Sequence, residues 1–374
     1  MLIPGLDSMG GAERQVMLLA QGLRRRGWRV SVVALSGSGG AARSNLQAAG
    51  VAFLSLSMRK GLADPRGWVR FHRWLRRETP DVVHAHLPHA AWLARWSRLG
   101  AAVPAVVDTL HSSSVGTLGR RLGYRFSNWL PHRVTAVSRA VAEAHLCAHM
   151  VSSEKLIVLP NGIDTEAWRP DPEVRALLRG ELGLEDEFLW LAAGRLDPVK
   201  NYPALLQAAA RISTPSRLLI AGSGRLRDEL TALAARLGLG LRVRFLGFQP
   251  DMRRWMQAAD GFVLASRWEG LPMALLEAAA CALPIVATDV PGTREAIDDG
   301  HAGRLAAPGN PEALAAAMMT AMRDSPEERR AMGMRARKRV MERFGLDAVL
   351  DRWEALYGEL MSARRSQFPV ASRH

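Results

Sequence analysis

The stretch GFVLASRWEGLPMALLEAAACALPIVATD, residues 261–289, contains the pattern that decides the fold. Two short apolar runs, 261–265 and 284–288, flank a segment with helical spacing, and Pro272 stands near the first position of that segment. Proline is favoured at the start of a helix, and apolar runs that alternate with helices are typical of βαβ units with parallel strands. The stretch therefore predicts a parallel sheet that is covered by helices.

The same alternation of apolar runs and helical segments continues along the chain in both directions. Residues 162–172 interrupt it, because they include Pro170 and Pro172 and have no sustained period, so we expect a linker there. The candidate strands are residues 29–35, 51–56, 81–86, 105–110, 133–138 and 156–160 before the linker, and residues 188–193, 217–221, 243–246, 261–265, 284–288 and 303–306 after it. The repeat of one architecture on both sides of the linker predicts two α/β domains.

The chain length also agrees with two domains. A chain of 374 residues is too long for one ordinary core and suits two cores of about 150–190 residues each. We expect a first domain at residues 1–165 and a second domain at residues 173–345. A helix at residues 346–362 is expected to pack back on the first domain, and residues 363–374 are expected to form a disordered tail.

The first strand of the first domain is short. Only Met1, Leu2 and Ile3 precede Pro4 and the turn at residues 5–11, whereas a strand usually has about five or six residues. The opening strand of a doubly wound sheet is central, so its shortening would leave neighbouring backbone groups unpaired. We therefore expect the natural start of the protein to lie upstream of Met1.

The cysteine and hydropathy patterns indicate the compartment. Cys147 and Cys281 form no close pair and no metal-binding spacing, which disfavours both a disulfide framework and a zinc site and agrees with a reducing cytoplasm. No stretch reaches the roughly 18 apolar residues of a membrane span, and no signal-peptide pattern opens the chain. We expect a cytoplasmic protein that is neither secreted nor integral to a membrane.

Positive charge is concentrated in the first domain. Residues 1–150 contain 20 Lys and Arg against 7 Asp and Glu, a net charge of +13, and the rest of the chain carries +1 of the total of +14. Such a field attracts an anionic surface such as phospholipid, nucleic acid or a polyanionic substrate. A basic genomic bias is the alternative, which the near-neutral second half disfavours. Our candidate for contact with anionic lipid is a helix at residues 66–77, whose basic face consists of Arg66, Arg70, Arg73 and Arg77.

Two carboxylates follow the strand at residues 261–265. Glu269 lies in the loop after this strand, and Glu277 lies further along the next helix. The free N–H groups at a helix N-terminus suit a phosphate or a sugar oxygen, and an ionised carboxylate accepts directional hydrogen bonds from hydroxyls. The two glutamates can therefore bind two hydroxylated rings. Helix capping alone is the alternative interpretation.

Two cations follow another apolar strand. Arg195 and Lys200 lie in the segment GRLDPVKN, residues 194–201, between the strand at residues 188–193 and a helix. Ligands bind at the carboxyl ends of strands in open α/β sheets, and a guanidinium together with an ammonium would neutralise a diphosphate there. Two solvated charges on a loop are the alternative interpretation.

The first domain also has candidate ligand-binding residues at strand ends and at the start of a helix. Gly10 and Gly11 open a helix, where small residues allow a ligand to approach the backbone. Four histidines, His84, His86, His89 and His111, lie at or near the ends of two successive strands. No carboxylate or further ligand stands close to them in the sequence, which disfavours a zinc site. We expect their imidazoles to contact substrate oxygens instead.

Taken in order, these motifs resemble those of the retaining glycosyltransferases of family four. That family has the GT-B architecture, an α/β fold of two Rossmann-like domains whose parallel sheets face a central cleft. The resemblance covers nearly the whole chain. It rests on Gly10-Gly11-Ala12-Glu13-Arg14, Asp81-Val82-Val83-His84-Ala85-His86, the strand ending in His111, Thr135-Ala136-Val137-Ser138, Pro160-Asn161-Gly162-Ile163-Asp164, the pair Arg195 and Lys200, and the pair Glu269 and Glu277.

The resemblance implies three sets of site residues. The donor-binding set consists of Gly11, Gly194, Arg195, Lys200, Glu269, Gly270, Leu271 and Glu277. The catalytic set consists of His111, Arg195, Lys200 and Glu269. The acceptor-side set consists of Gly10, Arg14 and His86.

The activity that the resemblance implies is metal-independent and uses no cofactor. A hexose or N-acetylhexosamine would pass from a UDP- or GDP-linked donor to a lipid-linked or polysaccharide acceptor in cell-envelope or exopolysaccharide biosynthesis, at the inner face of the membrane. Departure of the nucleoside diphosphate needs charge stabilisation, which Arg195 and Lys200 can supply. The sequence contains no Asp-x-Asp motif of the kind that metal-dependent glycosyltransferases use.

Other functions remain as alternatives. A sugar-nucleotide epimerase or a glycan phosphorylase would share the architecture, but the spacing of Glu269 and Glu277 disfavours the first and the modest chain length the second. A catalytically inactive scaffold is the alternative that the short first strand suggests. Nucleic acid is not the expected partner, and salt-dependent filter binding would detect it.

Overall fold

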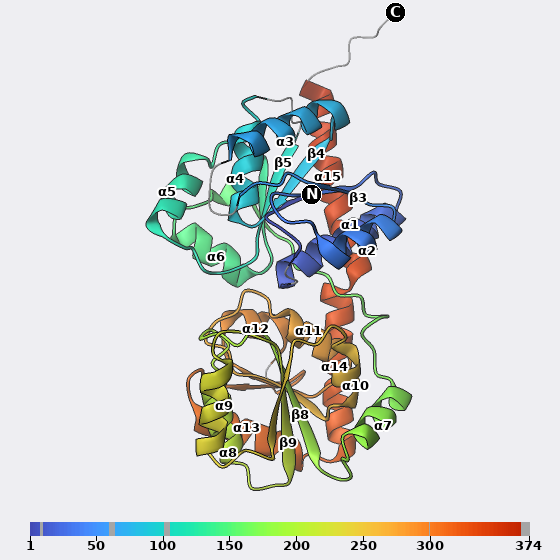
Figure 1. The fold of residues 1–374 in the computed structure, drawn as a ribbon, viewed down its shortest axis with the longest axis vertical. Coiled ribbons are helices and arrows are strands. Elements are labelled where there is room, and N and C mark those ends of the chain that lie inside the picture. The colour runs from blue at the N-terminus through green and yellow to red at the C-terminus, as the bar shows by residue number, and fades with distance from the viewer. Residues whose placement is uncertain (8–9, 60–63, 101–104, 299, 368–374) are drawn as a thin grey trace, which may run out of the picture. The chain divides into compact units, whose positions relative to one another are not determined.

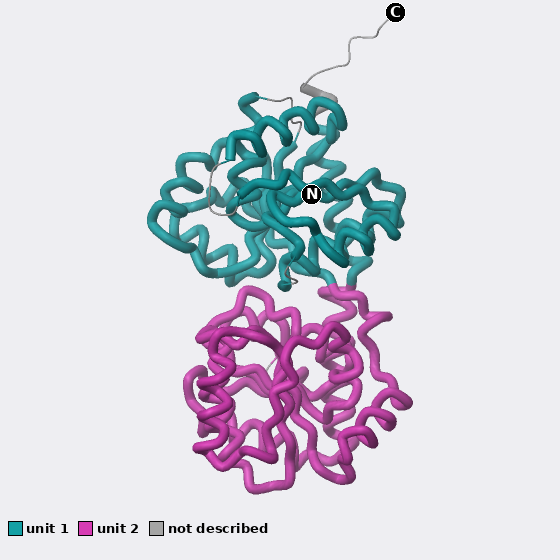
Figure 2. The backbone as a smooth tube through the Cα atoms, viewed as in Figure 1, with its two compact units in different colours: residues 1–162, 346–374 teal, residues 163–345 magenta. Residues whose placement is uncertain are grey.

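The computed structural model describes residues 1–7, 10–59, 64–100, 105–298 and 300–367. The chain divides into two compact units, drawn in different colours in Figure 2. Unit 1 comprises residues 1–162 together with residues 346–374, and unit 2 comprises residues 163–345. Each unit contains one parallel sheet, so the expected α/β class with two parallel sheets is confirmed.

The sheet of unit 1 has seven strands in the order β3-β2-β1-β4-β5-β6-β7, all parallel. β1 is short, as the sequence indicates, but backbone hydrogen bonds to β2 start at the carbonyl of Met1 and extend to that of Pro4. The strands are β1 (Leu2–Ile3), β2 (Ser31–Ala34), β3 (Ala52–Ser55), β4 (Val82–His86), β5 (Ala105–Leu110), β6 (Arg133–Ala136) and β7 (Leu156–Val158).

Helices cover this sheet on both faces (Figure 1). α15 packs beside α1, and its Val349, Leu350 and Trp353 share a buried cluster with Leu19 and Leu23 of α1. This packing places the last helix of the chain in unit 1. The helices are α1 (Gly11–Arg25), α2 (Gly40–Ala48), α3 (Pro65–Glu78), α4 (Pro88–Ser97), α5 (Leu118–Phe126), α6 (Arg139–Cys147), the short 3-10 helix Ser153–Lys155, and α15 (Leu346–Gln367).

The sheet of unit 2 has six parallel strands in the order β10-β9-β8-β11-β12-β13. Its core is built around the central strand, where Trp190 is 1% exposed. The strands are β8 (Phe188–Ala193), β9 (Ser216–Ala221), β10 (Val243–Gly247), β11 (Gly261–Leu264), β12 (Ile285–Thr288) and β13 (Arg304–Ala306).

Some helices of unit 2 begin after a residue whose side chain accepts from free backbone N–H groups. Asp171 caps α7 and Ser325 caps α14, and each is followed by a proline at the first helical position. α8, α9 and α13 lie on one face of the sheet, and α7, α10 and α14 lie on the other (Figure 1). The helices are α7 (Pro172–Glu181), α8 (Tyr202–Ala210), α9 (Arg227–Arg236), α10 (Arg253–Ala258), α11 (Met273–Ala280), α12 (Pro291–Ala296), α13 (Pro311–Arg323) and α14 (Pro326–Phe344).

The end of the chain differs from the expectation. The sequence predicts helix up to Ser362 and a disordered tail from residue 363, whereas the backbone of α15 is helical to Gln367. The remaining tail, residues 368–374, lies outside the described residues. None of the helices among the described residues has the length and apolar content needed to cross a membrane.

Both sheets reverse their strand order at one point. The reversal lies between β1 and β4 in unit 1 and between β8 and β11 in unit 2. In doubly wound sheets, ligands bind outside the carboxyl ends of the strands at such a point. The segments that follow β4, β5, β8 and β11 contain most of the residues that the sequence singles out.

Candidate functional site

Two loops of unit 2 meet at the carboxyl ends of β8 and β11. The loop after β8 spans residues 194–201, and the loop after β11 spans residues 265–272. The backbone N–H of Arg267 donates to the carbonyl of Val199 at 2.8 Å, which joins the two loops directly. The adjacency of β8 and β11 in the sheet therefore brings together residues that are distant in the sequence.

An ion pair between Lys200 and Glu269 lies at this junction. The Lys200 Nζ is 2.5 Å from the Glu269 Oε1, and the Ser266 Oγ donates to the same oxygen at 2.6 Å. The side chains of Lys200 and Glu269 are only 19% and 11% exposed. A carboxylate with two fixed donors has a defined orientation, as recognition of sugar hydroxyls requires. The structure thus brings together two residues that the sequence predicts for one site.

Arg195 lies apart from this ion pair. Its side chain is 84% exposed, and its Nη2 is 3.3 Å from the Oδ2 of Asp197. The Asp197 Oδ1 accepts from the N–H groups of Val199 and Lys200 at 3.1 and 3.3 Å, so Asp197 also folds the loop. An exposed guanidinium on an ordered loop remains available to an anionic ligand.

Glycines allow the backbone of these loops to pack closely. Gly194 has a φ of +154°, and a Cβ on Gly222 at the end of β9 would lie 1.9 Å from the Gly194 carbonyl oxygen. A side chain on Gly292 in α12 would lie 2.5 Å from the Glu269 carbonyl oxygen. Only glycine fits such approaches. Sequence reasoning missed Gly222 and Gly292, because their partners come from other strands.

The remaining residues predicted in unit 2 line the start of α11. Gly270 and Leu271 are buried in the loop before it, and Glu277 lies one turn into the helix at 5% exposure. The loop is also fixed from β12, where the Thr288 Oγ1 donates to the Ser266 carbonyl at 2.6 Å. Ser266 and Thr288 are further residues that the sequence interpretation did not identify.

The predicted residues of unit 1 include two adjacent imidazoles. His86 ends β4 and His111 follows β5, and the His86 Nδ1 is 3.1 Å from the His111 Nε2. The other ring nitrogen of each, His86 Nε2 and His111 Nδ1, is buried and has no partner among the described residues. Unpaired buried polar atoms at strand ends favour a ligand-binding role over a purely structural one.

His84 has a structural role. Its Nδ1 contacts the Tyr357 hydroxyl at 2.7 Å and its Nε2 contacts the Thr109 Oγ1 at 2.6 Å. Thr109 contacts the Thr135 Oγ1 at 2.7 Å, so the polar row continues across β4, β5 and β6 to α15. Both ring nitrogens of His84 have partners within unit 1, which favours a structural role for this residue over contact with substrate. His89 is exposed on α4.

The other predicted residues of unit 1 lie at the start of α1. Gly10 is the N-cap residue, Gly11 is the first residue of the helix, and no side chain caps this end. A Cβ on Gly10 would lie 2.6 Å from the Glu13 Oε2. The N–H of Arg14 donates to the Gly10 carbonyl at 3.1 Å. Residues 8–9 of this loop lie outside the described residues.

Burial keeps the histidine cluster neutral. It lowers the pKa of His111 to about 4 and, together with neighbouring positive charge, lowers the pKa of His84 and of His86 well below the usual range. Each folded-state pKa lies below the unfolded value, so below pH of about 6.5 the unfolded chain binds protons that the folded chain does not. The cluster therefore favours folding above that pH and opposes it as the pH falls toward 4.

We expect acidification from pH 7.5 to pH 4.5 to lower the free energy of unfolding by about 3 kcal/mol through His111 alone, since one pKa unit corresponds to about 1.4 kcal/mol. Urea unfolding at both pH values measures the change. In His111→Gln, which cannot titrate, the decrease should be smaller than in the wild type. Equal decreases in the two proteins would contradict this assignment.

Metal binding has no obvious site in the described part of the chain. No group of three or more His, Cys, Asp or Glu is arranged there to hold a metal ion. The cations and carboxylate at the ends of β8 and β11 are suited instead to an anionic, hydroxylated ligand.

Comparisons with known proteins identify relatives of both units. Residues 9–167 match the family described as Glycosyltransferase Family 4, and residues 174–339 match the family described as Glycosyl transferases group 1. The two matches together cover both units. They agree with the resemblance indicated by the sequence motifs.

Individual relatives match over most of their length. The chain is 30% identical to N-acetyl-alpha-D-glucosaminyl L-malate synthase of Bacillus anthracis, over 76% of each chain. It is 26% identical to UDP-Gal:alpha-D-GlcNAc-diphosphoundecaprenol alpha-1,3-galactosyltransferase of Escherichia coli, over 80% of this chain and 81% of the relative. The crystal structure of HepE of Anabaena in complex with UDP and glucose has a TM-score of 0.84 at 23% identity, over 96% of this chain and 98% of that one. The last match shows a shared fold.

Proposed function

The chain belongs to the group 1 and family 4 glycosyltransferases, and we propose that it moves a hexose or N-acetylhexosamine from a UDP- or GDP-linked donor to a lipid-linked or polysaccharide acceptor. The proposed transfer retains the anomeric configuration and takes place in cell-envelope or exopolysaccharide biosynthesis, at the cytoplasmic face of the membrane. Relatives named for transfer to a diphosphoundecaprenol acceptor support this choice of acceptor.

The observation that carries the proposal is the Lys200–Glu269 ion pair at the strand-order reversal of unit 2. A sugar donor presents a diphosphate next to a ring of hydroxyls. An ammonium and a carboxylate 2.5 Å apart can bind these two groups, the first the phosphates and the second the hydroxyls. When the donor binds, its phosphates would replace Glu269 as the partner of Lys200, and its sugar hydroxyls would replace Lys200 as the partner of Glu269.

The other donor-binding roles follow from the placement of the residues around this pair. Arg195, exposed on the adjoining loop, would join Lys200 at the diphosphate. Glu277 would bind the ribose. The backbone N–H groups of Gly270 and Leu271, just before α11, would contact the phosphates. Gly194, whose own N–H donates to the Ala221 carbonyl, would allow the donor to approach the loop after β8.

The acceptor side is proposed to lie in unit 1. His111 would stand beside the reacting sugar, and its partner His86 has an unpaired ring nitrogen that can meet an acceptor hydroxyl. Gly11 would approach the diphosphate through the start of α1, while Gly10 and Arg14 would lie near the acceptor.

The proposed chemistry depends on stabilising the departing nucleoside diphosphate. Bond cleavage leaves positive character on the sugar and an additional negative charge on the phosphates, and fixed cations lower the energy of that state. Lys200 and Arg195 supply two such cations from the chain itself. This supports transfer without a resident divalent ion.

We therefore expect turnover of the productive donor to persist in excess EDTA, because side chains rather than a bound cation neutralise the diphosphate. A panel of UDP- and GDP-sugars is screened first by thermal shift, since a ligand that binds the native state raises the melting temperature. Release of UDP or GDP from the stabilising donors is then measured with EDTA and with added magnesium.

Complete loss of turnover in EDTA with recovery on adding magnesium or manganese would exclude this mechanism. Stabilisation by a donor without any sugar transfer would favour an inactive scaffold. Conversion of the donor into an isomeric sugar nucleotide without acceptor would instead favour an epimerase.

A further inference from the structure

An apolar stripe on α5 faces away from the core of unit 1. Leu118, Leu122 and Phe126 are 67%, 43% and 71% exposed. At about 100° per residue these positions fall within one face of the helix. Tyr124, on the opposite side, is 1% exposed and packs inward. α5 thus fills the core with one face and leaves a second apolar face without a partner within the described part of unit 1.

Two further exposed tryptophans lie on segments next to α5. Trp129, in the turn after α5, is 60% exposed. Trp92 on α4 is 38% exposed, and its ring packs so tightly on α5 that a Cβ on Gly123 would lie 2.0 Å from its Cζ2. We call the set Trp92, Leu118, Leu122, Phe126 and Trp129 the α5 surface.

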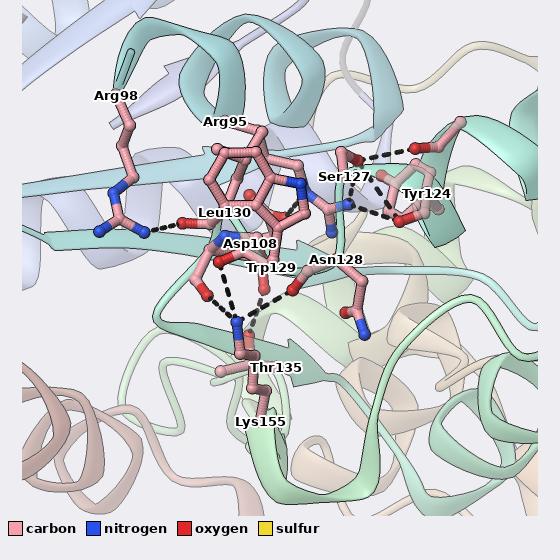
Figure 3. Close-up of polar contacts among 12 residues, drawn as sticks. Arg95, Arg98, Asp108, Tyr124, Ser127, Asn128, Trp129, Leu130, Thr135 and Lys155 are labelled. Carbon is pink, nitrogen blue, oxygen red and sulfur yellow. Dashed lines mark hydrogen bonds and ion pairs between the residues drawn. The ribbon is translucent and has the colours of Figure 1, made fainter.

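Two half-buried cations, Lys155 and Arg98, hold the turn that ends the α5 surface (Figure 3). The Lys155 Nζ donates to the carbonyls of Asn128, Trp129 and Pro131 at 3.0, 3.1 and 2.9 Å. Arg98 donates to the carbonyl of Leu130. These bonds fix the backbone under Trp129, so the exposed rings project from an ordered base.

The α5 surface lies in a segment with almost no negative charge. Between Val82 and Ala142 the sequence has seven arginines and one acidic residue, Asp108. Asp108 is buried and paired with Arg95, so it does not offset the field at the surface. On α5 itself Arg121 and Arg125 are exposed. Exposed apolar side chains therefore stand beside exposed cations with no carboxylate of this segment near them.

We infer that the α5 surface docks on a bilayer that contains anionic phospholipid. Leu, Phe and Trp side chains favour the boundary between headgroups and acyl chains, and arginines bind the phosphates above it. The inference deepens the proposed function and rests on it for its purpose, because a lipid-linked acceptor presents its sugar at that boundary. Two independent features, apolar exposure and charge, fit this one partner.

α3 combines exposed apolar side chains with exposed cations less fully than α5 does. Its Phe71 and Leu75 are buried, so the apolar face of the helix packs inward, while Arg66, Arg70 and Arg73 are exposed. The helix that the sequence favoured for lipid contact thus offers mainly charge, with Val69 at 49% exposure as an apolar side chain beside it. It can attract a leaflet, whereas α5 can also insert side chains into it.

The inference is tested by co-sedimentation with vesicles of phosphatidylcholine alone and of phosphatidylcholine with phosphatidylglycerol. The variants are Leu122→Gln with Phe126→Gln, which removes apolar contact, and Arg121→Gln with Arg125→Gln, which removes charge. We expect each pair to lower the partition coefficient on anionic vesicles about tenfold or more, since each basic residue near a charged leaflet is worth about fivefold in binding. Wild-type binding should fall steeply with salt.

The matched control is Leu177→Gln with Leu241→Gln, which alters two leucines of unit 2 that are 66% and 98% exposed. It should bind vesicles as the wild type does. Equal wild-type binding to both kinds of vesicle, or unchanged binding of the Leu122 and Phe126 variant, would overturn the inference. If the wild type is a dimer and the Leu122 and Phe126 variant is a monomer with unchanged vesicle binding, the surface contacts a second copy of the chain. That result would also overturn the inference.

Donor binding separates this test from that of the proposed function. The thermal shift with the stabilising UDP- or GDP-sugar is measured on the same preparations, and all variants should retain it. Retained donor binding with no vesicle binding contradicts the docking surface alone. Absence of any donor shift in the wild type contradicts the proposed function.

Discussion

Replacing Lys200 by alanine is expected to lower kcat about 10²- to 10³-fold, the effect of removing one fixed group that stabilises charge in a transition state. The ammonium is held beside the Glu269 carboxylate at the end of β8, where the proposed diphosphate departs. Its loss removes a cation that is already oriented before the reaction. Steady-state release of nucleoside diphosphate measures the effect.

The second variant is Arg195→Ala, in which a change in activity is not accompanied by a change in stability. The Arg195 side chain is 84% exposed, so its truncation removes almost no packing and should leave the melting temperature unchanged. A large fall in turnover would then report contact with the ligand. Lys200→Ala also leaves the Glu269 carboxylate with Ser266 as its remaining donor, so a moderate loss of stability accompanies the loss of activity.

Two control variants make the result specific. Lys338→Ala removes a lysine of α14 that is 77% exposed, and Arg244→Ala removes an exposed arginine of β10. Both should keep wild-type turnover. If turnover is unchanged in both Lys200→Ala and Arg195→Ala, neither cation belongs to the site. Glu269→Gln should weaken turnover while leaving binding of free UDP or GDP nearly intact.

The fold could be predicted closely where burial dominates the sequence. The strands at residues 105–110 and 188–193 have the expected bounds, and every residue in them is buried. Other strands differ at their ends. The strand expected at residues 29–35 is Ser31–Ala34, although the Val30 carbonyl just before it still accepts from the N–H of Ala52 in β3. Hydrogen bonding, rather than hydropathy, decides such ends.

The site could be predicted only in part. Lys200 and Glu269 stand 69 positions apart, yet each follows a strand end, and the rule that ligands bind at strand ends placed them together. Ser266, Thr288 and Gly222 also lie at strand ends, but their contacts with these loops depend on the pairing of β9, β11 and β12, which the sequence pattern does not reveal. The partners of His84 on β5 and α15 were hidden for the same reason.

The α5 surface shows a further limit of sequence patterns. α3 and α5 both read as amphipathic helices, and the sequence cannot tell which apolar face is covered. In α3 Phe71 and Leu75 are buried, whereas in α5 Tyr124 is the residue that packs inward and both leucines stay outside. Packing against neighbouring elements, rather than the sequence pattern, determines which apolar helix face is covered.

The largest expected effect on stability comes from a buried ion pair in unit 1. The Arg95 Nε is 2.5 Å from the Asp108 Oδ2, and both side chains are at most 1% exposed. Arg95 also donates to the Ser127 Oγ at 2.8 Å (Figure 3). Burial raises the pKa of Asp108, and the charge of Arg95 opposes that rise. Removing either partner leaves an ion in a medium that solvates it poorly.

The two single variants should not be equivalent. Asp108→Leu leaves a guanidinium that cannot lose its proton, and we expect a loss of about 3–5 kcal/mol in the free energy of unfolding. Arg95→Met leaves a carboxylate that can bind a proton in the folded state, so its loss should be smaller. In that variant the folded-state pKa of Asp108 exceeds the unfolded value, and lowering the pH from 7 toward 5 should therefore recover part of the lost stability.

The double variant Arg95→Met with Asp108→Leu distinguishes two contributions to the free energy of unfolding: the net stabilisation by the ion pair and the destabilisation by a buried ion without its partner. Because replacing both partners of a buried pair by apolar residues is often nearly neutral, we expect it to be more stable than Asp108→Leu by at least about 2 kcal/mol. Urea unfolding at pH 7 and pH 5 measures all three proteins. The exposed pair Arg254 and Glu181, whose side chains are 43% and 50% exposed, serves as the control, and its single variants should change stability by about 1 kcal/mol or less. Equal losses for Asp108→Leu and the double variant would show that the buried charge is not what destabilises the single variant.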